Sequence, residues 1–394
     1  MNIKIIAIIV VAAVVVAGGA AAFFLLSPEG EKDREINILA AVNEEGSGLY
    51  IKSDVELNTM FDFSTPIPTA LKEGWGGKVF GTPGPTSIQH TQLMTIVKEL
   101  GLKFTLYQAS SPISNDTVYF DSGVSNASLA LGNGHIDGGI VWQPQYEKII
   151  ADSSNKFKEL ALTNDLFPEH ACCVLAGVHS YVSGHQDETV RLLVAYIQAT
   201  RWVNNAMNDK SGADYQRLVT IAKNLAGPNF SEDEMKDALK TVTYTYGGNN
   251  SDPLGDLKGN IVTLVDNLTS IDSNLSKNFD KLGFSSKAAF ADSLVDDEYL
   301  LKALDIISGI DEMGDHESLT DITVAVISGD IHQIAIHVAK ELGYFEDYGL
   351  NVSFSLGVNG AGVATALQNG NASFGLLGAP PLTITVINSE LIKG

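Results

Sequence analysis

Strand-like and helix-like segments alternate along most of this chain, and this alternation constrains its fold more than any other feature. Apolar runs typical of buried strands stand at INILAAV (36–42), KVFGTPG (78–84), IDGGIVW (136–142) and ITVAVIS (322–328). Segments with helical spacing separate them, the longest at 186–207. Such alternation predicts an α/β fold, a parallel or mixed sheet covered by helices. Ligands in such folds bind at the carboxyl ends of strands, near helix N-termini.

Two segments repeat one pattern. ALGNGHIDGGIVWQP (130–144) and ALQNGNASFGLLGAPP (366–381) each combine a helix end, a glycine-containing turn, a short strand and a proline. We interpret them as the same supersecondary step in two related lobes. Between the lobes' strands, residues 210–315 are expected to form successive helices.

An uninterrupted apolar run extends from Ile5 to Leu26. A membrane-spanning helix needs about 20 apolar residues, whereas the core of a signal peptide has roughly 7–15. We therefore expect residues 1–35 to form a transmembrane anchor or signal and a linker, with Ala20–Ala22 left open as a cleavage site. Lys4 before the run and acidic residues after it predict a single-pass protein of the cell membrane with most of the chain extracytoplasmic.

The charge of the chain excludes one class of partner. The net charge is −22, with 47 acidic against 25 basic residues. Nucleic acid is not an expected partner, because its phosphates require a basic surface. Only Arg34, Arg191, Arg201 and Arg217 carry a guanidinium, so an anion site built on arginine is not expected either.

Catalytic and metal-binding patterns are weak. The two cysteines, Cys172 and Cys173, are adjacent, and neighbouring strand residues point to opposite faces. We expect two buried structural thiols and no disulfide between them. His170 stands nearby, but no second metal-type pair accompanies it. GxSxG, Walker and HExxH motifs are lacking, so we expect no metal, no cofactor and no enzymatic activity.

The segment SGDIHQIAIHVAKELGYFEDYGLNVSFSLGVNGAGVATALQNGNASFGLLGAPP (328–381) resembles the first lobe of nitrate/sulfonate/taurine-type solute-binding proteins, the NMT1-like family. GKVFGTPGPTSIQH (77–90) is similar to the ligand loop of that family's second lobe, and GHIDGGIVWQPQYE (134–147) to its next step. The resemblance implies a periplasmic-binding-protein-like (type II) fold whose two lobes close on a small solute. It also implies an ABC permease and ATPase as partners.

The order of these pieces departs from the family. The part that matches 321–394 comes first in the family and last here. Read as 321–394 followed by 36–320, the chain resembles one complete member, so we expect a circularly permuted fold. Lobe one would combine residues 36–50 and 176–394, of which 321–394 are its permuted first strands and helices, and lobe two would comprise 51–175. A partial second copy that pairs with another chain remains the alternative.

The expected ligand-binding residues lie on loops that this arrangement brings together. Thr86-Ser-Ile-Gln89 is a capping-box pattern, which predicts a helix N-terminus that faces the cleft. Gly378-Ala379-Pro380 predicts a second one, with proline at the first helical position. Further candidates lie on the loop after ITVAVIS, at Trp142 as an apolar wall of the cleft, and at Asn43 and Ser47 near the expected hinge. The full set is Ser328, Gly329, His332, Gly378, Ala379, Pro380, Asn43, Ser47, Thr82, Gly84, Thr86, Ser87 and Trp142.

These observations predict an extracytoplasmic binding protein of an ABC importer that captures a small, anionic solute such as nitrate, a sulfonate or a carboxylate. The alternative is an enzyme like the thiamine-pyrimidine synthases, which share the fold family and carry clustered cysteines. The apolar N-terminal run and the single cysteine pair argue against that enzyme, whose chemistry is cytosolic.

Overall fold

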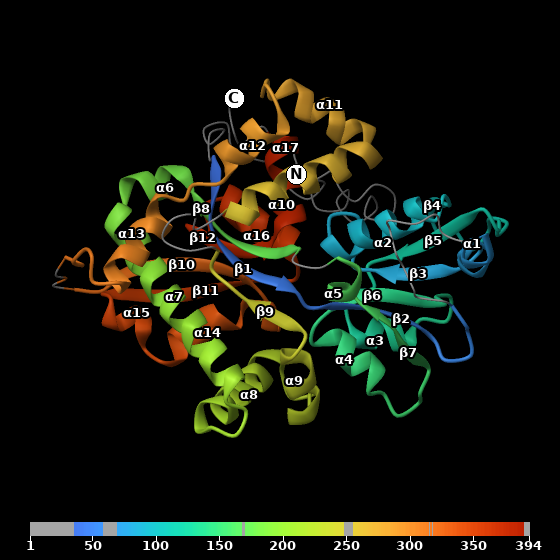
Figure 1. Ribbon diagram of the computed structural model, residues 1–394, viewed down its shortest axis with the longest axis horizontal. Helices are drawn as coiled ribbons and strands as arrows, with labels where there is room; N and C mark the ends of the chain where they lie inside the picture. Colours follow the sequence, from blue (N-terminus) through green and yellow to red (C-terminus); the bar gives the residue numbers. More distant parts are fainter. Residues whose placement is uncertain are drawn as a thin grey trace, which may run out of the picture. The chain divides into compact units, whose positions relative to one another are not determined.

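The computed structural model describes residues 35–57, 69–167, 170–247, 255–314, 316 and 318–389. Residues from Glu35 onward form one compact unit. Its strands make two six-stranded sheets, here called sheet A and sheet B (Figure 1).

Sheet A combines strands from both ends of the chain. Its order is β11-β10-β12-β8-β1-β9. The strands are β1 (Ile36–Glu45), β8 (Ala171–Val178), β9 (Val242–Tyr244), β10 (Thr320–Ile327), β11 (Leu350–Gly357) and β12 (Phe374–Gly378). The strand predicted at 322–328 thus lies in the same sheet as the strand predicted at 36–42, as expected.

Strands β10, β11 and β12 are parallel, and β8 joins them to β1 by antiparallel pairing. Val324, Val326, Phe374 and Leu376 are fully buried, which is typical of parallel strands covered on both faces. The C-terminal segment therefore supplies three of the six strands of sheet A, all on one side of β8.

Sheet B has the order β4-β5-β3-β6-β2-β7. Its strands are β2 (Ser47–Lys52), β3 (Val79–Thr82), β4 (Lys103–Leu106), β5 (Thr117–Ser122), β6 (Gly138–Trp142) and β7 (Phe157–Leu162). Strand β5 was not predicted, because the sequence DTVYFDS alternates polar and apolar residues only briefly.

Helices cover both sheets. Around sheet B lie α1 (Thr69–Trp75), α2 (Ile88–Glu99), α3 (Ala127–Gly132), α4 (Gln145–Ile150) and α5 (Thr163–Leu166). Around sheet A lie α6 (His179–Gly184), α7 (Gln186–Asn208), α8 (Ala213–Ala226), α9 (Glu232–Leu239), α10 (Gly255–Ile271), α11 (Ser273–Lys281), α12 (Lys287–Leu294), α13 (Glu298–Ile307), the 3₁₀ turn η1 (Ile331–Gln333), α14 (Ile334–Glu341), α15 (Tyr344–Asp347), α16 (Gly360–Gln368) and α17 (Ala379–Ser389).

The chain passes from sheet A to sheet B at Gly46, between β1 and β2, and returns between α5 and β8. The predicted boundaries, 50/51 and 175/176, each lie a few residues after the corresponding crossing. Gly46 has a φ of +88°, which favours glycine. A Cβ there would lie 2.3 Å from Nε2 of His332, so this crossing also requires glycine for close packing.

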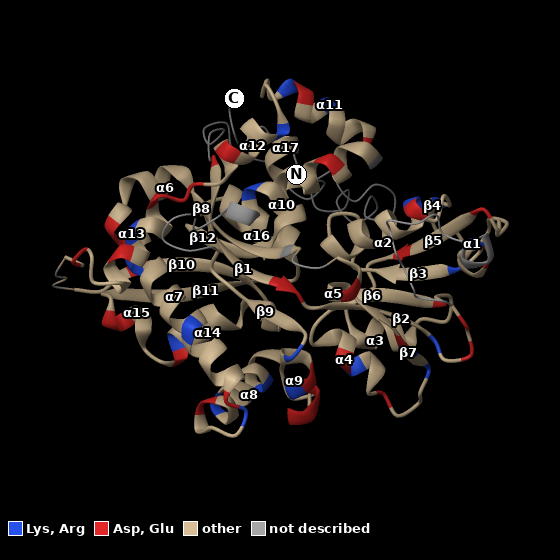
Figure 2. Cartoon of the chain, in the orientation of Figure 1, with Lys and Arg blue, Asp and Glu red and all other residues tan. Residues whose placement is uncertain are grey.

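The transmembrane segment predicted at 5–26 falls outside the described residues. Within the described part of the chain, no helix is both long and apolar enough to cross a membrane. In Figure 2 the strands of both sheets are largely free of charged residues, which gather in the outer helices and loops.

Candidate functional site

A small cavity of about 60 Å³ lies between the two sheets. From the sheet B side it is lined by Pro83, Thr86, Ser87, Ile88, Gln89 and Trp142. From the sheet A side it is lined by Cys172, Cys173, Ile327, Asp330, His332, Asn359, Gly360, Ala361, Gly378 and Pro381. A small solute in this cavity would contact residues from both sheets.

Three helices begin at this cavity. Ser87 caps α2, and its hydroxyl accepts a hydrogen bond from the backbone N–H of His90 at 3.2 Å. Asn359 caps α16 in the same way, through Gly362 N–H at 3.0 Å. Helix α17 begins directly after Gly378. Helix N-termini present unpaired N–H groups and a positive dipole end, so the cavity is suited to negative charge.

None of the described residues that line the cavity is lysine or arginine. Anion recognition here would depend on backbone N–H groups, hydroxyls and His332. This agrees with the scarcity of arginine in the sequence.

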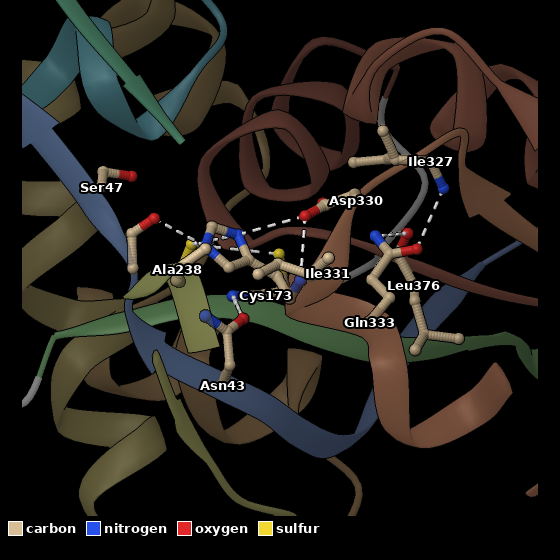
Figure 3. Close-up of polar contacts among 12 residues, drawn as sticks. Asn43, Ser47, Cys173, Ala238, Ile327, Asp330, Ile331, Gln333 and Leu376 are labelled. Carbon is tan, nitrogen blue, oxygen red and sulfur yellow. Dashed lines mark hydrogen bonds and ion pairs between the residues drawn. The ribbon is translucent and has the colours of Figure 1, made fainter. Parts of the chain in front are cut away.

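The sheet A wall holds a cluster of four buried side chains (Figure 3). Cys172 and Cys173 come from the start of β8, and Asp330 and His332 from the loop after β10. Sγ of Cys172 lies 3.9 Å from Sγ of Cys173 and 3.8 Å from Nδ1 of His332. Oδ1 of Asp330 lies 3.4 Å from the same Nδ1. On its other side, Nε2–H of His332 donates to the carbonyl of Gly46 at 2.7 Å.

A β-bulge explains how two adjacent cysteines reach the same side of a strand. Asn43 of β1 pairs with Cys173, but the next residue, Glu44, pairs with Ala171, so Cys172 is an extra residue on β8. A bulge re-aims the side chain that it carries. Both thiols are free and buried, as predicted, but they do not point to opposite faces.

The cluster shifts the protonation of its members. Burial alone would lower the pKa of His332, yet the neighbouring Asp330 and Cys172 raise it to about 9. Burial raises the pKa of Asp330 to about 6, although His332 opposes this. The contact with the Cys173 thiol lowers the pKa of Cys172, and His332 adds to the effect. At neutral pH the wall therefore favours an imidazolium at His332 beside a carboxylate at Asp330.

Five of the thirteen residues predicted to bind ligand line the cavity: Thr86, Ser87, Trp142, His332 and Gly378. They come from four separate stretches of sequence that the two sheets bring together. Their role in binding stays a prediction.

The other eight do not line it. Asn43 instead accepts from the backbone N–H of Cys173, and Ser47 Oγ accepts from the amide of Gln89 (Figure 3 labels Asn43 and Ser47). The hydroxyl of Thr82 bonds Nδ1 of His90, and the carbonyl of Gly84 accepts from Ser87. Ser328 is exposed, Gly329 approaches the end of α8, Ala379 lines a neighbouring cavity and Pro380 is buried.

Two details of helix capping were predicted wrongly. The cap of α2 is Ser87 rather than Thr86, and Gln89 bonds Ser47 instead of closing a capping box. Pro380 occupies the second position of α17, not the first. In both cases the helix frame differs by one residue from the sequence pattern.

Sequence reasoning missed the two cysteines, Asp330 and the N-terminus of α16 as cavity residues. Asn359-Gly-Ala-Gly is itself a capping signal and was available from the sequence. The placement of Cys172 beside His332, 160 residues away in the chain, has no local signal.

Two sheets joined at a glycine crossing, with a small cavity lined from both sides, are the arrangement of a two-lobed binding-protein fold. The NMT1-like family model matches residues 10–215, and the NMT1/THI5-like model matches residues 331–389. The first match covers more than half of the chain, so the chain belongs to the NMT1-like family, that of nitrate/sulfonate/taurine-type binding proteins. Members of this family generally bind small solutes and work with ABC permease and ATPase partners. No curated protein and no solved structure matches the chain.

Proposed function

We propose that this protein is the extracytoplasmic solute-binding protein of an ABC importer and captures a small anionic solute between its two lobes. The observation that carries the proposal is the meeting of three helix N-termini, those of α2, α16 and α17, at one small cavity. His332, on the sheet A side of the cavity with the starts of α16 and α17, adds positive charge at neutral pH. The family match supports a solute such as nitrate, bicarbonate, a short sulfonate or a short carboxylate.

A thermal-shift screen of these anions, with ammonium and choline as cationic controls, tests the proposal. The best anion should then bind more weakly to Thr86→Ala by about 1–3 kcal/mol, because the exposed hydroxyl of Thr86 lies at the cavity. Thr220→Ala is the matched control, because it removes an exposed hydroxyl on α8 that does not line the cavity. A cationic solute as the best ligand, or normal binding by Thr86→Ala, would contradict the assignment.

The second candidate is an enzyme like the thiamine-pyrimidine synthases. The contact of Cys172 with His332 in the cavity wall is the observation that favours it, because a thiol beside an imidazole is a common catalytic pair. The two functions differ in one readout. A binding protein returns its solute unchanged after prolonged incubation, whereas the enzyme would complement a strain that lacks the pyrimidine branch of thiamine synthesis.

We further propose that the fold is circularly permuted. Three parallel strands from the C-terminal segment, β10, β11 and β12, lie beside β8 and β1 in one sheet. The family matches support this proposal, because they fall on the two ends of the chain in an order compatible with permutation. Lobe one would then comprise 36–50 and 176–394, and lobe two 51–175, with the crossings shifted to those of the sheets.

Retention at the cell membrane through residues 5–26 is also a proposal. The length of the apolar run supports it. Fractionation of cells followed by N-terminal sequencing should find the mature protein in membranes with this run intact. A soluble form that begins near Phe23 would show that the run is a cleaved signal.

A further inference from the structure

The sulfur and nitrogen atoms of the buried wall cluster have the spacing of metal ligands. Sγ of Cys172, Sγ of Cys173 and a ring nitrogen of His332 all lie within 4.8 Å of one another. In tetrahedral zinc coordination, with Zn–S of about 2.3 Å and Zn–N of about 2.0 Å, two sulfurs lie roughly 3.8 Å apart and sulfur and nitrogen roughly 3.6 Å apart. The observed separations are 3.9 Å between the sulfurs and 3.8 Å from Cys172 to Nδ1.

The surroundings of His332 prepare it as a ligand. Its Nε2–H donates to the carbonyl of Gly46 at 2.7 Å, which leaves the lone pair of the neutral ring on Nδ1, toward the cysteines. Metal-binding histidines commonly donate their second N–H to such a partner, which sets the tautomer and the ring orientation. Asp330, 3.4 Å from Nδ1, adds a negative charge beside the position that a cation would occupy.

We propose that Cys172, Cys173 and His332 bind one divalent ion of the zinc type. Two thiolates and one imidazole select zinc and its neighbours over magnesium or calcium, which prefer oxygen ligands. All three ligands line the cavity, so the fourth coordination position opens toward the space where a solute would sit. The expectation of no metal combined the two cysteines with His170, whose Nε2 instead contacts the amide nitrogen of Gln92 at 2.8 Å.

The site goes beyond solute binding and does not depend on it. A metal here would join the start of β8 to the loop after β10, two segments that are 160 residues apart in sequence. Loss of the metal would leave the three helix N-termini in place, so anion binding can be tested separately, in the metal-free protein.

Cobalt(II) titration of the metal-free full chain tests the proposal, in a buffer without the candidate anions. One equivalent should produce the sulfur-to-cobalt charge-transfer band and the intense visible bands of tetrahedral Co²⁺, and Zn²⁺ should displace it. The chain contains two cysteines only, so any thiolate band reports Cys172 or Cys173. Zn²⁺, but not Mg²⁺, should also raise the melting temperature of the wild-type protein by mass action.

Variants assign the ligands. Cys172→Ser, Cys173→Ser and His332→Gln should each weaken Co²⁺ binding by at least roughly 100-fold, more than the loss of a supporting residue around a metal site. His170→Gln is the matched control and should bind like wild type. Absence of a thiolate band in the wild-type protein would overturn the proposal even if the variants fail to fold. So would a band that survives His332→Gln and disappears in His170→Gln.

Discussion

Gly46 is the residue on which the two sheets and the cavity wall meet. Its carbonyl accepts from Nε2–H of His332 and from the backbone N–H of Gln143, so it contacts both sides of the crossing. Its φ is +88°, and a Cβ at this position would lie 2.3 Å from Nε2 of His332, which leaves no room for a side chain.

We predict that Gly46→Ala lowers the free energy of unfolding by about 1–3 kcal/mol, because an alanine there combines backbone strain with a displaced His332. Denaturant unfolding measures the change. Gly134→Ala is the control, since a Cβ at that loop position meets nothing within 4 Å and its φ is not positive. Equal stability of the two variants would show that the crossing tolerates a side chain.

A second prediction at this scale concerns His90 and the pH dependence of the free energy of unfolding. It lies buried between Phe104 and Phe120 and bonds the hydroxyl of Thr82, and burial lowers its pKa to about 4. Above pH 6.5 the ring is neutral in both the folded and the unfolded chain. As the pH falls from about 6.5 to about 4, His90 becomes protonated in the unfolded chain but stays neutral in the folded protein. The free energy of unfolding therefore decreases in this pH window.

The loss should reach about 3 kcal/mol, at 1.36 kcal/mol for each unit of pKa difference. Urea unfolding of wild type and His90→Gln at several pH values between 4 and 7 measures it, and the variant should show a shallower dependence. His185→Gln, at an exposed position, should keep the wild-type dependence. Identical pH profiles for wild type and His90→Gln would refute the assignment.

At the residue scale, the position of a residue near the end of a strand was predictable from local sequence. Contacts that depend on the register between distant strands were not. Ser87 comes shortly after β3 and Trp142 is the last residue of β6, so the pattern placed them at the cavity. Thr82 also follows this rule, but the side chain at the very end of β3 turns to His90 instead. The paired thiols required the bulge between β1 and β8, which arises from pairing of distant strands and has no signature in the sequence ACCV.

At the scale of elements, the long apolar strands and the long helices were predictable, because burial and helical spacing repeat within each segment. Strand β9 was missed, since its three residues form a strand only by pairing with the end of β1. Gln333 shows how tertiary contacts set the ends of other strands. Its amide accepts from Ile327 N–H at 2.9 Å and donates to the carbonyl of Leu376 at 2.9 Å, which links β10 and β12 beside the cavity (Figure 3).

At the scale of the whole molecule, the position of the C-terminal segment decides how the fold is assembled. Strand β12 pairs with β8 over five residues, from Phe374 opposite Gly177 to Gly378 opposite Cys173. Strands β10 and β11 follow outward from β12. Without this segment β8 would present an unpaired edge, and α7 would lose α14, which packs against it.

The proposed permutation therefore predicts that the order of the segments can be exchanged. In a rearranged chain, residues 318–389 would precede residues 35–314, joined by a flexible glycine-serine linker. It should fold with the same secondary structure and bind the same anion, because every strand pairing in sheet A is kept. A chain that ends before Thr320 should fail to fold, because sheet A would lose three of its six strands.

Circular dichroism, thermal unfolding and binding of the anion selected by the screen compare the three chains. The rival view treats 321–394 as part of a second copy that pairs with another chain. If this view is right, the shortened chain should fold by itself, and the rearranged chain should be no more stable than the shortened one. The permuted fold expects the reverse, since β8 needs β12 on one side as it needs β1 on the other. A shortened chain that folds would decide against permutation.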